Sequence, residues 1–148
     1  HRAAGKMFLG SYTIDASDRE TYIEGIDFTS RPTAISGLYS YVQDYHDPHE
    51  GALVEIEILN GNAGAESVIG KGRAVLSPST SFTRFVVPVV YSVRNKKATR
   101  LKVLISSSSY ASHSIREESQ KIKTTDNIKQ AVSIGATMIV DNLQLLYE

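Results

Sequence analysis

Residues 25–41 read G-I-D-F-T-S-R-P-T-A-I-S-G-L-Y-S-Y, which joins a turn, a fixed kink and an aromatic strand. Pro32 fixes its own φ angle and restricts Arg31 to an extended conformation. We therefore expect the side chain of Arg31 to leave the backbone in a defined direction. Beyond the kink, Tyr39 and Tyr41 alternate with smaller residues, which predicts a strand that carries both tyrosines on one face.

Strands with a clear inner and outer face are predicted further along the chain. Residues 53–59 alternate apolar side chains with Glu55 and Glu57, as expected for a half-buried strand. Residues 82–93 contain Pro88, which indicates an edge strand or a bulge. The inward-facing positions expected in these and the following strand are Val54, Ile56, Ile58, Phe85, Val87, Val89, Tyr91, Leu101, Val103 and Ile105.

The whole chain of 148 residues is predicted to form a single all-β domain. About eight or nine strands follow one another at short intervals, with at most one helix, and this pattern is typical of an antiparallel β-sandwich, here expected to be a jelly roll. Residues 110–133 are polar and lack an apolar stripe, so they are interpreted as a surface insertion before the last strand. That last strand is expected over residues 135–147.

Composition excludes some classes of protein. Lys and Arg together number 16, as do Asp and Glu, so the basic excess of a typical nucleic-acid-binding protein is missing. The apolar runs are shorter than the ~20 residues of a membrane helix. Cysteine is absent, which excludes disulfides and thiolate metal sites. Because strand-like sequence begins at Gly5 without a visible signal peptide, we expect either the C-terminal domain of a longer protein or a mature product.

Three segments resemble a known family. The sequence of residues 25–41, G-K-M-F-L-G-S-Y at residues 5–12 and V-D-N-L-Q-L-L-Y at residues 140–147 are similar to a bacterial carbohydrate metabolism domain family, which has a carbohydrate-binding-module-like jelly roll. The resemblance covers most of the chain and implies a surface, secreted or periplasmic bacterial protein. Residues 110–133 depart from it, because the family's connection at this point is shorter and richer in glycine.

Arg31 and four tyrosines are the candidate ligand-binding residues. Sugar rings stack their C–H faces on aromatic side chains, and their hydroxyl groups bond to charged or amide groups. A row of tyrosines beside Arg31 would therefore suit a saccharide. The alternative is that the tyrosines fill the margin of the core. The tyrosines concerned are Tyr39, Tyr41, Tyr45 and Tyr91.

Asp141 is the candidate metal ligand. A regular strand would place it on the same face as Ile139, Leu143 and Leu145, and a buried carboxylate needs a metal, an arginine or backbone donors. Similar strands end jelly-roll carbohydrate-binding modules and hold a structural calcium, which is the role that the resemblance implies for Asp141. The alternative is a bulge at Asp141 that turns its side chain toward backbone donors or an arginine.

Glu55 and Glu57 allow an enzymatic alternative. Positions i and i+2 of a strand are about 6.6 Å apart on one face, within the roughly 5 to 9.5 Å that separate glycosidase carboxylates. A third carboxylate is missing, because Asn60 stands where jelly-roll glycosidases carry one. A solvated outer face of the strand also explains both residues.

The function predicted from the sequence is therefore a non-catalytic carbohydrate-binding or carbohydrate-associated module. Its partners would be a polysaccharide or oligosaccharide and upstream domains of the same polypeptide, and it would require no cofactor apart from the calcium considered above. The alternatives are a jelly-roll glycoside hydrolase that uses Glu55 and Glu57, and a structural or adhesion module that binds no glycan.

Overall fold

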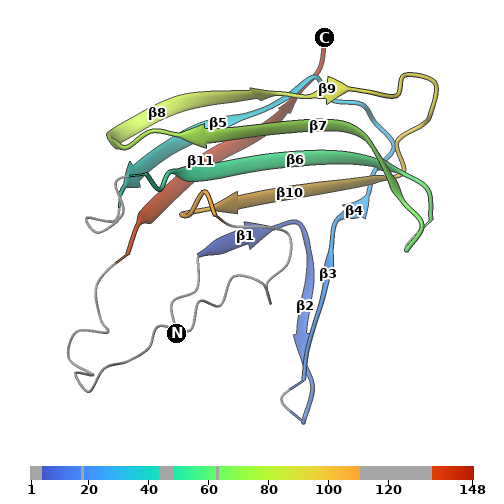
Figure 1. The fold of residues 1–148 in the computed structure, drawn as a ribbon, viewed down its shortest axis with the longest axis horizontal. Coiled ribbons are helices and arrows are strands. Elements are labelled where there is room, and N and C mark those ends of the chain that lie inside the picture. The colour runs from blue at the N-terminus through green and yellow to red at the C-terminus, as the bar shows by residue number, and fades with distance from the viewer. Residues whose placement is uncertain (1–4, 18, 44–48, 63, 111–134) are drawn as a thin grey trace.

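The computed structural model describes residues 5–17, 19–43, 49–62, 64–110 and 135–148, and these form an all-β protein. They contain eleven strands arranged in antiparallel sheets, and none of these residues lies in a helix. Two sheets form the two layers of a sandwich (Figure 1). No helix among the described residues is long and apolar enough to cross a membrane.

The larger sheet has six strands. Five of them follow the order β1-β10-β6-β7-β9, and β4 pairs with the other end of β10. Its strands are β1 (Lys6–Phe8), β4 (Ile26–Asp27), β6 (Ala52–Asn60), β7 (Ser67–Leu76), β9 (Val90–Tyr91) and β10 (Arg100–Ser106).

The smaller sheet has the order β11-β5-β8, so β5 is its central strand. A separate hairpin of two strands projects away from the sandwich (Figure 1). The strands of the smaller sheet are β5 (Ala34–Val42), β8 (Ser79–Pro88) and β11 (Thr137–Leu146), and those of the hairpin are β2 (Gly10–Ile14) and β3 (Glu20–Glu24).

One hydrophobic core fills the space between the two sheets. The alternation predicted for residues 53–59 is confirmed, because Val54, Ile56 and Ile58 are completely buried in this core. The inward positions predicted for β8 and β10 are also confirmed. These are Phe85, Val87, Val89, Leu101, Val103 and Ile105. Apolar side chains at every second position therefore determined how these strands face the core.

Pro88 marks the point at which the chain changes sheets. It ends β8, an edge strand of the smaller sheet, and β9 begins two residues later in the larger sheet. The prediction of an edge position for Pro88 is confirmed. A Cβ atom on Gly72 would lie 2.4 Å from the carbonyl oxygen of Pro88. Glycine at position 72 thus allows the chain to pass close to β7 as it crosses between the sheets.

The last strand contains a β-bulge. Asp141 pairs with Leu38 and Gln144 pairs with Ser36, so β11 has one more residue than β5 in this interval. The extra residue exchanges the inward and outward positions of the strand: Met138 and Val140 pack against the core before the bulge, and Leu145 does so after it. The first half of β11 therefore faces the opposite way from the prediction.

Candidate functional site

Arg31 fastens the loop between β9 and β10 to the edge of the sandwich. Its Nη1 donates to the carbonyl oxygens of Arg94 at 2.7 Å and Lys96 at 3.0 Å, and its Nη2 donates to that of Val93 at 3.0 Å. Its guanidinium carbon also lies 4.4 Å from the centre of the Tyr91 ring. The structure thus brings together two of the predicted ligand-binding residues, Arg31 and Tyr91.

Tyr91 is held between this guanidinium and the backbone. Its hydroxyl donates to the carbonyl oxygen of Pro32 at 2.6 Å, and a Cβ on Gly70 would approach its ring to 2.7 Å. Burial raises the pKa of Tyr91 above its ordinary value, the Arg31 charge opposes this rise, and Tyr147 adds to it. The ring is half-buried, so its contacts with Arg31 and Pro32 hold the kink of residues 31–32 against β9.

Tyr39 and Tyr41 do not form the expected exposed row, and that prediction was wrong. Both belong to the core, with 7% and 1% of their surfaces exposed. Their hydroxyls donate to carbonyl oxygens at the rim of the sandwich, Tyr39 to Ser77 at 2.9 Å and Tyr41 to Ser107 at 3.0 Å. Side chains alternate between the two faces of a strand, and buried Ile35 shares its face with both tyrosines. The odd-numbered residues of β5 therefore face the core. Tyr45 lies outside the described residues.

Asp141 is exposed, so the expectation of a buried carboxylate was also wrong. Its Oδ1 accepts the backbone N–H of Asn142 at 2.7 Å. Asn142 has a φ of 53°, in the left-handed region that asparagine tolerates better than most residues. The physical reason is the bulge, which leaves Asp141 on the outward face. The calcium role that the resemblance implies for Asp141 stays untested, and an exposed carboxylate that already accepts a backbone N–H does not require an ion.

A hollow opens on the outer face of the smaller sheet beside this bulge. Its volume is about 350 Å³. No pattern in the sequence indicates this hollow directly, although a bulge at Asp141 is one of the two expected arrangements of the strand. It is lined by Ser36, Gly37, Leu38, Arg84, Asn142 and Gln144.

Polar groups from three strands meet in this hollow. Ser36 comes from β5 and Arg84 from β8, while Asn142 and Gln144 come from the bulged part of β11. The Nε2 of Gln144 donates to Oδ1 of Asn142 at 3.3 Å, which orients the two amides relative to each other. Arg84 makes no ion pair with any residue that the structure describes. Guanidinium and amide groups are thus available here to bond a ligand.

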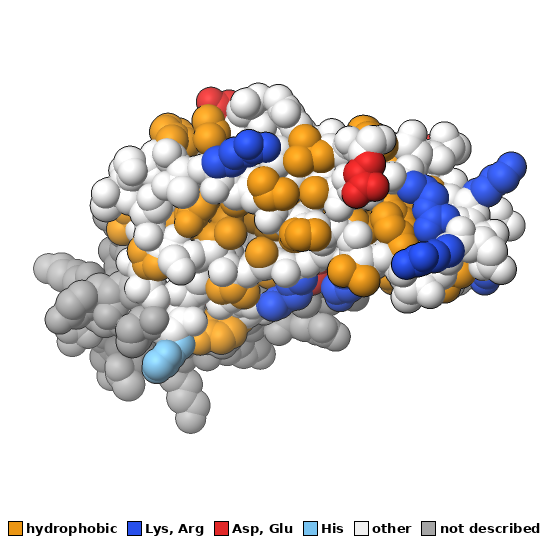
Figure 2. Space-filling view, turned by 90° about the horizontal axis from the view of Figure 1, so that it is seen from above, with side chains coloured by type: hydrophobic (Ala, Val, Ile, Leu, Met, Phe, Trp, Pro, Cys, Tyr) orange, Lys and Arg blue, Asp and Glu red, His pale blue; other side chains and the backbone are white. Residues whose placement is uncertain are grey.

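Apolar side chains surround these polar groups. Phe82 and Val86 flank Arg84 on the same face of β8, with 54% and 47% of their surfaces exposed. Ile139 of β11, which pairs with Ser40 of β5, is also exposed. Seen from above, hydrophobic side chains spread across the middle of this side of the molecule (Figure 2). The face combines apolar area with a few grouped polar side chains, which is typical of a small-ligand site.

Glu55 and Glu57 lie on the outer face of the larger sheet, away from this hollow. Lys71 Nζ lies 3.8 Å from Oε2 of Glu55 and 3.5 Å from Oε1 of Glu57. Arg73 Nε lies 3.4 Å from Oε2 of Glu55. All four residues are cross-strand neighbours on β6 and β7, where opposite charges stabilise the pairing. Glu55 is only 7% exposed and Glu57 is half-buried, so the solvated outer face expected for this strand was wrong, and the four side chains form a network of ion pairs.

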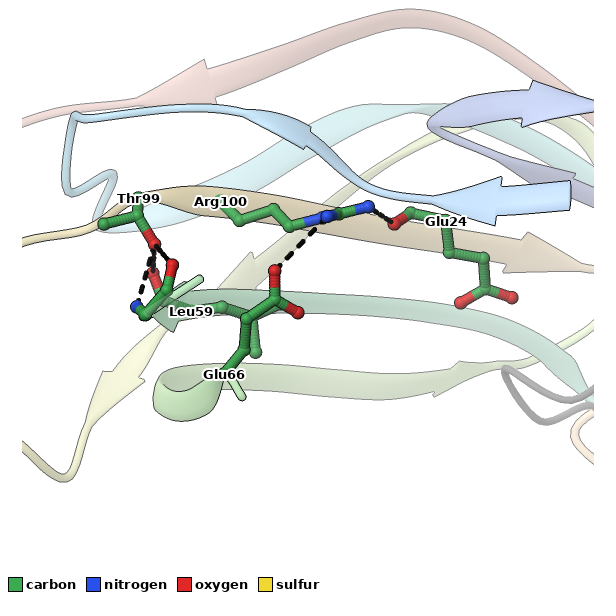
Figure 3. Close-up of polar contacts among 6 residues, drawn as sticks. Glu24, Leu59, Glu66, Thr99 and Arg100 are labelled. Atoms are coloured by element: carbon green, nitrogen blue, oxygen red, sulfur yellow. Dashed lines mark hydrogen bonds and ion pairs between the residues drawn. The ribbon is translucent and has the colours of Figure 1, made fainter. Parts of the chain in front are cut away.

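Arg100 is a further residue that the sequence did not single out. Its Nη1 donates to Oε1 of Glu66 at 3.2 Å, and its Nη2 donates to the carbonyl oxygen of Glu24 (Figure 3). Its Nε is buried and has no hydrogen-bond partner among the described residues. Beside it, Thr99 Oγ1 donates to the carbonyl oxygens of Leu59 and Gly61 and accepts the N–H of Gly61 (Figure 3). These contacts join the start of β10 to β3, to the end of β6 and to the residue that precedes β7.

Comparison of the chain with protein-family models, with curated proteins and with solved structures gives no match. Within the described part of the chain, no group of three or more His, Cys, Asp or Glu residues is placed to hold a metal ion. The candidate sites are therefore the hollow beside the β11 bulge and the edge of the sandwich where Arg31 contacts Tyr91.

Proposed function

We propose that this domain is a non-catalytic carbohydrate-binding module of a bacterial surface, secreted or periplasmic protein. The supporting observation is the hollow on the outer face of the smaller sheet, where Arg84, Asn142 and Gln144 meet. Jelly-roll connectivity of the sandwich and attachment to upstream domains are part of the same proposal.

The chemistry of the hollow suits a hydroxylated ligand. The Arg84 guanidinium only donates, whereas the Asn142 and Gln144 amides both donate and accept, so together they match the mixed demands of neighbouring sugar hydroxyls. Exposed Phe82 and Val86 supply apolar area for the C–H face of a sugar ring. The volume of about 350 Å³ is at the lower end of the range for ligand pockets and suits a small unit, such as one end of a glycan chain.

The hydrolase alternative finds less support. The ion pairs with Lys71 and Arg73 engage Glu55 and Glu57, and both carboxylates lie on the sheet opposite the hollow. An adhesion role remains the alternative to glycan binding, because the exposed apolar side chains around the hollow are equally suited to contact a protein surface.

A glycan array followed by calorimetry with the best-bound glycan tests this proposal. Arg84→Gln and Gln144→Ala should each weaken binding of that glycan by tenfold or more, because each leaves sugar hydroxyls unpaired. Lys102→Gln, which removes one charge from the larger sheet instead, is the matched control and should leave affinity unchanged. If no glycan binds, or if the Arg84 and Lys102 variants behave alike, the hollow is not a saccharide site.

A further inference from the structure

The loop between β9 and β10 carries a concentration of positive charge. Arg94, Lys96 and Lys97 are exposed, and none of them forms an ion pair with the described residues. This contrasts with Arg19, Lys71, Arg73 and Arg100, which all pair with carboxylates. Among the described residues, three positive charges without an ion-pair partner therefore lie within one short segment, residues 93–97, called here the basic loop.

The backbone of the basic loop is fixed in place. Arg31 binds the carbonyl oxygens of Val93, Arg94 and Lys96, and Asn60 Nδ2 donates to the carbonyl oxygen of Lys97 at 2.7 Å. A fixed backbone lowers the entropy that must be lost when the side chains bind a partner. Arg31 also adds its own positive charge directly behind the loop.

The surroundings of the basic loop are partly apolar. Val90 is 72% exposed, and Tyr147 is 55% exposed and follows Leu146, whose carbonyl oxygen accepts the backbone N–H of Thr33 at 2.7 Å. Lys and Arg side chains gather at the end of the molecule where this loop lies, next to the hydrophobic middle (Figures 1 and 2). Positive charge beside an exposed aromatic ring suits a ligand that carries both acidic groups and apolar C–H faces.

We propose that the basic loop binds the sulfate or carboxylate groups of an acidic polysaccharide. The choice of a polysaccharide as the carrier of these groups rests on the proposed function, but the residues are different from those of the hollow. A nucleic acid is a poorer match, because the zero net charge and a single short basic segment do not provide the extended positive surface that such ligands contact.

Binding to dextran sulfate and to uncharged dextran of equal length, measured by calorimetry at low and physiological salt, tests this inference. Lys96→Gln/Lys97→Gln should weaken dextran sulfate binding about tenfold and reduce its salt dependence, because two charge contacts are lost. Lys6→Gln/Arg19→Gln is the matched control: it also changes the formal net charge from zero to minus two, but Lys6 pairs with Ser106 at the far end of β10 and Arg19 lies in the turn between β2 and β3. This control should bind dextran sulfate nearly as well as the wild type.

A second variant tests the role of the fixed backbone. Arg31→Lys keeps the charge but loses the fork that holds three carbonyl oxygens, so dextran sulfate binding should fall severalfold while the protein remains folded by circular dichroism. Equal loss of binding in both double variants would show that only overall charge matters and would overturn the proposal. Stronger binding to double-stranded DNA or to phosphatidylserine vesicles than to dextran sulfate would also overturn it.

The two sites can fail separately. Loss of neutral-glycan binding in Arg84→Gln with unchanged dextran sulfate binding would concern the hollow alone. Loss of dextran sulfate binding in Lys96→Gln/Lys97→Gln with unchanged neutral-glycan binding would concern the basic loop alone. If wild-type protein bound neutral glycans but not dextran sulfate, the proposed function would stand and the inference about the basic loop would be wrong.

Discussion

The guanidinium of Arg31 lies 4.4 Å from the centre of the Tyr91 ring, and the same side chain donates to three carbonyl oxygens of the next loop. Tyr91 in turn donates to the carbonyl oxygen of Pro32. The residue that follows Arg31 in the chain is therefore fixed by the ring on which Arg31 stacks. This closed set of contacts connects the start of β5 in the smaller sheet with β9 in the larger sheet.

Arg31→Lys is expected to lower the free energy of unfolding by about 1 to 3 kcal/mol. Lysine retains the charge but cannot donate to three carbonyl oxygens from a planar fork, so some of the β9–β10 loop carbonyls lose their partner. Urea unfolding followed by circular dichroism measures this change. Arg84→Lys, at an exposed arginine without such contacts, is the control and should stay within about 0.5 kcal/mol of wild type. Equal stability of the two variants would mean that the bonds from Arg31 to the β9–β10 loop do not stabilise the fold.

Tyr91 is expected to make stability decrease at high pH. Burial raises its pKa in the folded protein above the value of 10.0 expected in the unfolded chain. Its contribution is therefore complete below about pH 10 and is lost as the pH rises through the folded pKa, because the unfolded chain releases the phenolic proton first.

Tyr91→Phe removes this titrating group together with the hydrogen bond to Pro32. The variant should be less stable than wild type at neutral pH, and its stability should fall less steeply above about pH 10. Urea unfolding of both proteins at a series of pH values measures the difference, which separates Tyr91 from the lysines that titrate in the same range. Parallel stability profiles would show that Tyr91 does not contribute.

Strand positions were predictable from sequence where the two faces differ strongly in polarity. In β6, Val54 and Ile56 alternate with Glu55 and Glu57, so only one orientation buries the apolar side chains. The same reasoning failed for β5. Tyrosine is amphipathic and suits either face, so Tyr39 and Tyr41 left both orientations open. The orientation is instead set by packing, in which Gly37 lies against the Phe85 ring and leaves no room for a Cβ.

The candidate site was harder to predict than the fold. A single extra residue between Asp141 and Gln144 exchanges the faces of β11, and no local pattern in that strand specifies its position. The hollow combines Ser36, Arg84 and Gln144 from three strands, so it exists only once strand order and register are known. Arg31 could be identified beforehand because Pro32 follows it directly.

The left-handed backbone at Asn142 gives a test of the bulge. Asn142→Gly should remain within about 0.5 kcal/mol of wild type, because glycine adopts a positive φ without strain. Asn142→Val should lose about 1 to 2 kcal/mol, because a branched side chain is strained at a φ of 53°. Thermal or urea unfolding distinguishes the two variants. Equal stability of both would mean that residue 142 does not have this conformation.

Calcium is expected to leave the melting temperature unchanged. Asp141 is exposed, and its Oδ1 already accepts the N–H of Asn142. Differential scanning calorimetry with calcium and with a chelator tests this expectation. An ion bound at 10 to 100 times its Kd would stabilise the domain by roughly 1.4 to 2.7 kcal/mol. A shift of that size in the wild type, lost in Asp141→Asn, would establish Asp141 as a calcium ligand.

The ion pairs of Glu55 and Glu57 predict a structural effect and no catalytic effect. Glu55 is only 7% exposed, and Glu55→Gln removes the carboxylate charge beside Arg73 and one of the two beside Lys71. Breaking such a pair costs more than breaking an exposed one, and we expect a loss of about 1 to 3 kcal/mol in urea unfolding. Asp15→Asn, which breaks the exposed pair with Arg19, is the control and should cost less than about 1 kcal/mol.

The same variants decide between a binding module and a hydrolase. Wild type and Glu55→Gln/Glu57→Gln should both release no reducing sugar from a panel of plant, bacterial and algal polysaccharides, because these carboxylates are engaged by cations and lie on the sheet opposite the hollow. A glycosidase needs one of its two carboxyl groups to donate a proton to the leaving oxygen. Reproducible release of reducing sugar by the wild type, lost in the double variant at a temperature where that variant is still folded, would reverse this conclusion in favour of the hydrolase.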